Sequence, residues 1–155
     1  MIKTHIISVG KIKEKAVNDI ISEYEKRLNK YTDFSAVVVD DLSLPQNPND
    51  GEIEKVLAKE AASIIKAIPK NAVKIALTIT GKQYTSTEFA DFISSRGSFC
   101  YIIGSSHGLH SSVVKMCDYE LSLSKMTFPH NLARLFLAEQ IYRSFKILNN
   151  ENYHK

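Results

Sequence analysis

The feature that most constrains the fold is an alternation of short β-branched runs with longer segments of helical periodicity. Strands are predicted over residues 4–9, 34–39, 72–79, 98–103 and 119–123. Helices are predicted over residues 14–28, from 52, over 87–93 with Thr87 as the cap, from about 110, and over 129–148. Because helices separate successive strands, we expect an α/β fold with a mainly parallel sheet and helices on both faces.

Length and composition indicate one ordinary globular domain. The 155 residues are 44% hydrophobic and 24% charged, and a chain of this size buries one core, so residues 1–155 are expected to form a single domain. The apolar runs are too short for a membrane span and the N-terminus lacks a secretory signal, so we expect a cytoplasmic protein without membrane contact. Cys100 and Cys117 lack the spacing of a zinc site, and no metal is expected.

The charge balance does not identify a partner by itself. The chain has 20 Lys and Arg against 17 Asp and Glu, a formal net charge of +3, which is too small to indicate nucleic-acid binding. Both ends of the chain are positive and the middle is negative. A polyanion is therefore expected to prefer the ends, although solvated helix faces explain the same distribution.

Three unusual loops follow predicted strands: Thr80-Gly81-Lys82, the segment from Gly104 to Gly108, and the segment from Ser124 to Pro129. In parallel α/β sheets, ligands bind in the loops that leave the carboxyl ends of the strands. We expect these loops to enclose a small molecule together, whereas each glycine taken alone is explained by a tight turn.

The second loop, Gly104-Ser105-Ser106-His107-Gly108, also fits the G-x-S-x-G pattern of hydrolases. Ser106 would be the nucleophile, with Asp118 and either His130 or His154 completing a triad. The short remainder of the chain and the lack of an upstream oxyanion loop disfavour this small serine hydrolase.

The last predicted helix and the tail carry further candidate residues. Apolar residues of the helix occupy more than one narrow stripe, which indicates contact with a second subunit or deep burial in its own domain. Glu139 and Arg143 are four residues apart, the favourable order for an ion pair. The tail from Tyr153 to Lys155 combines an aromatic ring, an imidazole and a cation, which suits RNA contact, although a frayed terminus has the same composition.

Several segments match one known family: Ile7 to Lys11, Glu23 to Leu28, Ile103-Gly104, Gly108 to His110, Leu123 to His130, Arg134, Glu139 to Arg143, and Tyr153 to Lys155. Over its whole length the sequence resembles the ribosomal RNA large subunit methyltransferase H family of the SPOUT superfamily. The resemblance implies a deep C-terminal trefoil knot that holds S-adenosylmethionine, an exception to unknotted topology. It also implies a homodimer that methylates N3 of a pseudouridine in 23S ribosomal RNA on the ribosome.

The resemblance assigns cofactor contacts to eight positions: Leu77, Gly104, Leu123, Ser124, Lys125, Met126, Thr127 and Phe128. Because the imide proton on N3 must leave, the reaction needs a base and a group that stabilises the anion. The candidate catalytic residues are His154, Arg143, Glu139 and Tyr153. The candidate RNA-binding residues are His130, Arg134 and Lys155.

Among these candidates, His154 is expected to accept the proton, Arg143 to stabilise the anion and Tyr153 to stack on the target base. Glu139 is expected either to orient Arg143 or to accept the proton itself. One subunit's tail is hypothesised to lie over the other subunit's cofactor. Ser105 stands where many relatives have a second glycine, so a slightly reshaped loop is expected. A knotted RNA-binding or ribosome-assembly factor without catalysis is the alternative function.

Overall fold

The computed structural model describes residues 1–95 and 97–155. The strands are β1 (Lys3–Val9), β2 (Asp33–Val39), β3 (Val73–Lys82), β4 (Ser98–Ile103) and β5 (Tyr119–Leu121). The helices are α1 (Lys15–Leu28), α2 (Asp50–Ala67), α3 (Ser86–Ser94), α4 (Ser111–Met116) and α5 (His130–Leu148). In the described ranges, no helix has the length and apolar character that crossing a bilayer demands.

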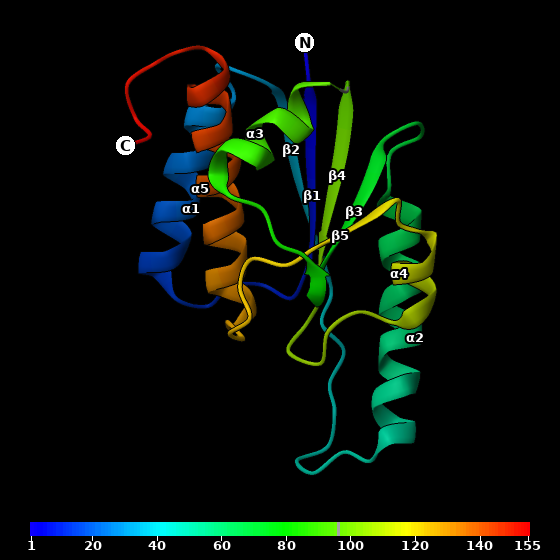
Figure 1. The fold of residues 1–155 in the computed structure, drawn as a ribbon. Coiled ribbons are helices and arrows are strands. Elements are labelled where there is room, and N and C mark those ends of the chain that lie inside the picture. Colours follow the sequence, from blue (N-terminus) through cyan, green and yellow to red (C-terminus); the bar gives the residue numbers. More distant parts are fainter. Residues whose placement is uncertain (96) are drawn as a thin grey trace.

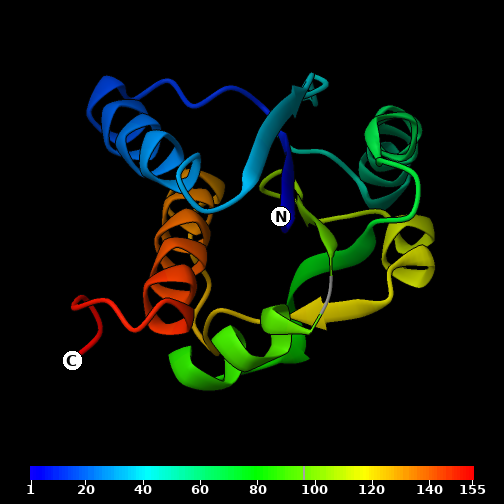
Figure 2. The ribbon, with the colours of Figure 1, turned by 90° about the horizontal axis from the view of Figure 1, so that it is seen from above.

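The five strands form one sheet in the order β2-β1-β4-β3-β5, and every pair is parallel. Helices α1, α3 and α5 pack together on one face, while α2 and α4 cover the other (Figures 1 and 2). The predicted α/β fold with helices on both faces is therefore confirmed. The carboxyl ends of β3, β4 and β5 point toward the end of the molecule at which α5 begins (Figure 1).

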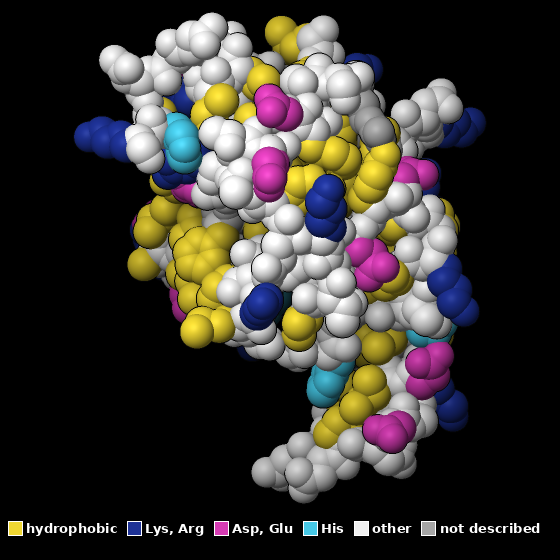
Figure 3. Space-filling view, in the orientation of Figure 1, with side chains coloured by type: hydrophobic (Ala, Val, Ile, Leu, Met, Phe, Trp, Pro, Cys, Tyr) yellow, Lys and Arg dark blue, Asp and Glu magenta, His cyan; other side chains and the backbone are white. Residues whose placement is uncertain are grey.

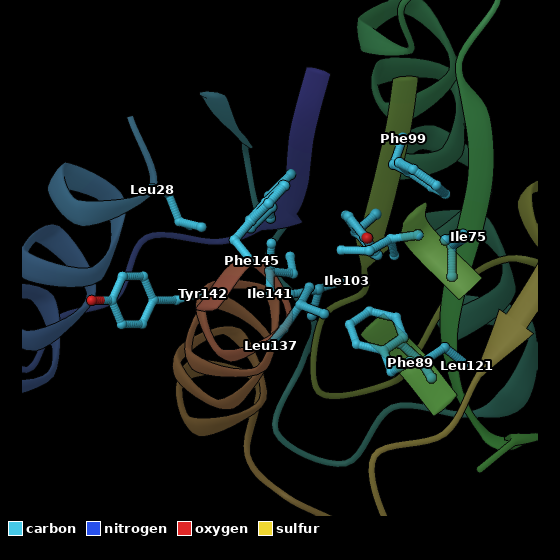
Figure 4. Packing of buried hydrophobic residues seen from close by; sticks show 13 residues of the cluster. Leu28, Ile75, Phe89, Phe99, Ile103, Leu121, Leu137, Ile141, Tyr142 and Phe145 are labelled. Carbon is cyan, nitrogen blue, oxygen red and sulfur yellow. The ribbon is translucent and has the colours of Figure 1, made fainter. Parts of the chain in front are cut away.

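Each face of the sheet has its own buried cluster because the strands alternate their side chains. Ile6, Tyr101 and Phe99 pack against the α1, α3 and α5 side, where Leu137 and Phe145 of α5 fill the interior (Figure 4). The opposite cluster is smaller and is made by β-strand and α2 residues together with α4. Full burial of one such side chain stabilises the fold by about 1.5–3 kcal/mol, so the buried residues between Leu137 and Phe145 anchor α5 to the sheet.

Two predicted helix starts were wrong by a turn or less. The cap of α3 is Thr85, whose side chain accepts from the backbone N–H of Glu88 while the Glu88 carboxylate accepts from Thr85 N–H. This reciprocal capping box satisfies two free amides, which Thr87 cannot do from inside the helix. Helix α2 likewise begins at Asp50 behind an Asn49 cap, two residues earlier than expected.

Strand β3 does not end at residue 79, as the sequence predicted, but runs through Gly81 to Lys82. A Cβ at Gly81 would lie 2.7 Å from the carbonyl carbon of Glu120 and 2.8 Å from the backbone nitrogen of Leu121. Position 81 therefore needs glycine because two backbones pass close together there, and not because the chain turns. The register between β3 and β5 shifts at this crossing, where Lys82 pairs with Leu121.

Candidate functional site

A cavity of about 740 Å³ opens at the carboxyl ends of β3, β4 and β5. Two of the three loops that sequence analysis selected, those after β4 and β5, contribute to it. The first, Thr80-Gly81-Lys82, is not among its lining residues, and β3 contributes residues 77–79 instead. Of the eight predicted cofactor positions, seven line the cavity: Leu77, Gly104, Leu123, Ser124, Met126, Thr127 and Phe128. Lys125 is not among the lining residues of the described chain. Segments far apart in the sequence thus meet around one space.

Gly104 and Gly108 shape one side of this cavity for different reasons. A Cβ at Gly104 would collide with the carbonyl oxygen of Gly108 and lie 2.5 Å from its carbonyl carbon. Gly108 has a φ of +82°, which residues with a side chain rarely adopt. Ser105 is not among the residues with positive φ, so a side chain at this position brings no backbone strain.

The cavity fits S-adenosylmethionine in size and in chemistry. Pockets that enclose ligands of this size measure roughly 300–1,000 Å³ and are mainly apolar with a few polar groups. Leu77, Leu123 and Phe128 supply apolar surface, and the tightly packed Gly104 brings backbone polar groups to the edge. The Ser124 hydroxyl accepts from Met126 N–H at 3.0 Å and fixes the third loop. The protein thus offers a preformed cradle.

His130 lies in the wall of the cavity at the start of α5, rather than on a remote surface. Its Nε2 atom is buried and has no hydrogen-bond partner among the described residues. The contact of His130 with an RNA phosphate remains a prediction. In this structure His130 lines the cavity. His130 was not predicted to lie in the cavity wall, although its position directly after Pro129, at the end of the third loop, is the signal that could have shown it.

The candidate catalytic residues gather around Glu139 on α5. Arg143 donates to Glu139 Oε1 from Nη2 at 2.6 Å and from Nε at 3.1 Å, which confirms the predicted ion pair. The Tyr153 hydroxyl donates to the same oxygen at 3.1 Å, and Gln140 donates to the other oxygen at 2.8 Å. His154 Nδ1 lies 3.2 Å from Arg143 Nη1. The tail is therefore docked on α5.

Aromatic contacts hold the tail in this position. The Tyr153 ring packs edge-on against Tyr142 with centroids 5.0 Å apart, and the Arg143 guanidinium lies 4.8 Å from the Tyr153 centroid. Burial, followed by the hydrogen bond with Tyr24 and the charge of Glu139, raises the pKa of Tyr153. The phenol therefore stays protonated and acts as a donor. His154 and Lys155 are exposed beyond it.

The cavity and the tail lie at opposite ends of α5 (Figure 1). His130 lines the cavity, and Arg143 holds the tail. At 1.5 Å per residue, these two positions are about 20 Å apart along the helix axis. A second cavity, of about 330 Å³, shares Leu123 and Phe128 with the first and reaches Glu139. Within one chain, the predicted proton acceptor does not reach the predicted cofactor position.

Arg134 is placed inside the fold, with 8% of its surface exposed. Its Nη2 donates to Glu25 Oε1 at 2.9 Å, which joins α5 to α1. RNA contact by Arg134 remains a prediction, but the observed pairing favours a structural role. Lys155, the third predicted RNA contact, is exposed at the tail.

The structure contradicts the serine hydrolase. Asp118 precedes β5 and accepts from Lys74 N–H at 2.7 Å, with Lys74 Nζ at 3.3 Å. Ser106 lies in the loop after β4, at the opposite, carboxyl-end edge of the parallel sheet. Asp118 therefore cannot orient a histidine for Ser106.

Comparisons with known proteins agree with these features. Residues 2–154 match the family model described as "Predicted SPOUT methyltransferase". A ribosomal RNA large subunit methyltransferase H from Carboxydothermus hydrogenoformans is 44% identical, with 97% of this chain and 98% of that protein covered. One from Ruminiclostridium cellulolyticum is 42% identical, with 99% of each covered. A solved probable methylase family protein from Haemophilus influenzae covers 100% of this chain and 72% of its own, with a TM-score of 0.56 and 14% identity.

The last comparison concerns the fold alone, and with the family model it supports the knotted fold. Two close backbone approaches agree with a knotted fold. Gly81 packs against the backbone of β5, and Gly104 packs against the backbone of Gly108. The family model and the full-length relatives lead to one conclusion: the chain belongs to the ribosomal RNA large subunit methyltransferase H family of SPOUT methyltransferases.

Proposed function

We propose that this protein methylates N3 of a pseudouridine in 23S ribosomal RNA, with S-adenosylmethionine as methyl donor. The observation that carries the proposal is the cavity formed by β3 and the loops after β4 and β5 in a chain of this family. The names of the full-length relatives support ribosomal RNA as the substrate. The pseudouridine and its N3 atom come from the resemblance of the sequence to that family.

The methyl donor supplies a methyl group already activated on a sulfonium, so the protein's main task is alignment. Leu77, Leu123 and Phe128 would bury the apolar parts of the donor, and backbone groups near Gly104 would hold its polar edges. Ser124, Met126 and Thr127 form the outer side of the same cavity, with Met126 75% exposed at its rim, and Lys125 would approach the donor only from outside this lining. No metal ligand is needed for this alignment.

In the proposed reaction, the tail would accept the imide proton from N3. Arginine only donates hydrogen bonds, so in the observed contact Nδ1 of a neutral His154 is the acceptor and Nε2 carries the proton. His154 therefore becomes a base for N3 when Nδ1 leaves Arg143. The freed guanidinium, still held by Glu139, would then stabilise negative charge on a neighbouring carbonyl oxygen. Tyr153 would stack on the base, and Lys155 and His130 would contact the RNA backbone.

A homodimer would bring the two halves of the site together. Hydrophobic side chains gather over the first half of α5 and the segment before it (Figure 3). Phe136 is 39% exposed there and packs edge-on against Phe128 at 5.2 Å. If two copies pair their α5 helices in opposite directions across this patch, the tail of one lies beside the cavity of the other. That arrangement would place a tail beside each cavity, although the two are about 20 Å apart along α5 within one chain.

The test is mass spectrometry of 23S ribosomal RNA from cells with and without this protein. We expect one pseudouridine to lose a methyl group in its absence and to regain it when the wild-type chain is supplied. The His154→Ala chain is the matched control and should not restore the methyl. An unchanged methylation pattern would contradict the enzyme and favour the non-catalytic assembly factor.

A further inference from the structure

The second cavity, of about 330 Å³, lies beside the cofactor cavity and between the start of α3 and the middle of α5. Leu121, Leu123 and Phe128 line both cavities. Phe89 and Leu137 form part of its apolar wall, and both belong to the buried cluster on this face of the sheet (Figure 4). A planar ring bound in the second cavity would therefore lie next to a donor bound in the first, which is the relation that methyl transfer requires.

Polar side chains meet at one side of this second cavity. Ser86 Oγ donates to Gln140 Oε1 at 2.7 Å, and Gln140 Nε2 donates to Glu139 Oε2 at 2.8 Å. Glu139 is ion-paired with Arg143 through its other oxygen at 2.6 Å, and a carboxylate only accepts hydrogen bonds. The carboxamide of Gln140 is therefore fixed in one orientation, with its nitrogen toward Glu139 and its oxygen toward Ser86.

The fixed carboxamide of Gln140 still has unused hydrogen-bonding groups. A carboxamide has two N–H donors and two acceptor lone pairs, and within the described chain its nitrogen and its oxygen are each used once. One donor and one acceptor therefore remain for a ligand in the cavity that Gln140 lines. Glutamine and asparagine use such a pair to read a base edge that presents an N–H group beside an acceptor.

Pseudouridine and uridine differ at an edge of this kind. In pseudouridine the ribose is attached to C5, so the ring presents a free N1–H beside the C2 carbonyl, whereas in uridine the glycosidic bond occupies N1. A carboxamide that accepts from N1–H and donates to the C2 carbonyl leaves N3 free for methyl transfer, and it cannot accept from N1 of uridine. Sites that hydrogen-bond a substrate N–H discriminate strongly against an analogue without it.

We propose that the second cavity receives the target base and that Gln140, held by Ser86 and Glu139, recognises its N1–H and C2 carbonyl. Gln140 thus determines the preference for pseudouridine over uridine. Enzymes that modify a base take it out of the stack into a close-fitting pocket with aromatic and apolar walls, and Tyr84 and Phe128 supply such walls here. This inference rests on the proposed function, because it takes the ring to be a pyrimidine of ribosomal RNA that is methylated from the first cavity.

The placement of the base agrees with the proposed homodimer. Phe136 lines the second cavity and is also the exposed residue of the apolar patch across which two copies would pair. That pairing would bring the tail of the other subunit beside the cofactor cavity. Because the two cavities share a wall, the same tail would lie near the base as well.

The test is single-turnover methylation of ribosomes that carry either pseudouridine or uridine at the target position, with radiolabelled S-adenosylmethionine. Gln140→Leu removes both hydrogen-bonding groups at nearly the same side-chain size. Gln46→Leu, at an exposed position between β2 and α2, is the matched control. We expect the wild type and the control to prefer pseudouridine, and the ratio of the two rates to fall by about tenfold or more in Gln140→Leu. The Kd for S-adenosylmethionine, measured by calorimetry, should change little.

Two results would overturn the inference and leave methylation of ribosomal RNA standing. In the first, Gln140→Leu keeps the wild-type ratio or slows both substrates equally. In the second, the wild type itself does not distinguish the two kinds of ribosome. If the wild type binds S-adenosylmethionine but methylates neither, the proposed function and the inference fall together. Ser86→Ala frees the carboxamide oxygen of Gln140 and should also lower the ratio, so it decides the question if thermal unfolding shows that Gln140→Leu is not folded.

Discussion

Arg143 Nη1 and His154 Nδ1 lie 3.2 Å apart at the end of α5 that is remote from the cavity. The proposed function thus assigns binding of the methyl donor and transfer of the proton to separate regions of one chain. Variants in the two regions should therefore fail in different ways, and this separation is measurable.

His154→Ala should abolish methyl transfer and spare cofactor binding. Loss of a general base lowers kcat by about 100-fold or more. His154 does not line the cavity of its own chain and would act on the RNA base rather than on the cofactor, so the Kd for S-adenosylmethionine should change little. Single-turnover methylation of ribosomes and calorimetry measure the two quantities. His5→Ala is the control, because His5 bonds Ser35 at the far edge of the sheet. A His154→Ala enzyme with wild-type kcat would remove His154 from the mechanism.

Gly104→Ala should prevent cofactor binding, because its methyl group would collide with the Gly108 carbonyl. The loop must shift, and a shift there narrows the cavity. Gly97→Ala is a matched control, since a Cβ at Gly97 meets nothing within 4 Å. Calorimetry should detect binding in the control and none in Gly104→Ala. Equal affinities would mean that the Gly104 loop does not contact the cofactor.

Arg134→Ala should destabilise the fold, because the substitution leaves Glu25 half-buried without its partner. Charged hydrogen bonds of this kind contribute about 1.5–3 kcal/mol, so the free energy of unfolding in urea should fall by about 2 kcal/mol. Lys15→Ala breaks the exposed pair with Asp19 and should leave stability unchanged. If Arg134→Ala keeps full stability but binds RNA more weakly, the original RNA assignment is right.

Sequence patterns predicted the parallel sheet and nearly every element because strand and helix periodicities were undisturbed by function. They failed where distant backbones meet. The glycine at position 81 looked like a strand end, since a close crossing by Glu120 and Leu121 leaves no mark in the local sequence. The buried state of Glu60 was equally hidden, because an acid on a helix is normally exposed. The loops of the cavity were visible, but the distance between cavity and tail required coordinates.

Both cysteines should resist alkylation in the folded protein. Burial, with the charge of Asp118 as a smaller cause, raises the pKa of Cys117 from 9.0 to about 11, and burial raises that of Cys100 to about 12. A raised thiol pKa removes thiolate at any pH below it, so at pH 8 Cys117 holds about 100-fold less of the reactive form than an ordinary thiol. Iodoacetamide labelling followed by mass spectrometry should be slow at pH 8 and fast in urea. Rapid labelling of folded Cys117 would contradict this.

Mixed dimers test whether the site is shared between subunits. One chain lacks residues 152–155 and keeps its cavity, while the other carries Gly104→Ala and keeps its tail. Each homodimer should be inactive. In random mixtures half of the dimers are mixed, and each would hold one complete site if the tail acts across the interface, so about a quarter of wild-type activity should return. If each chain used its own tail, no combination would contain a complete site and activity would stay at the background of the homodimers. Native mass spectrometry of the mixture controls for subunit exchange, because the chain without residues 152–155 is lighter and half of the dimers should have the mixed mass.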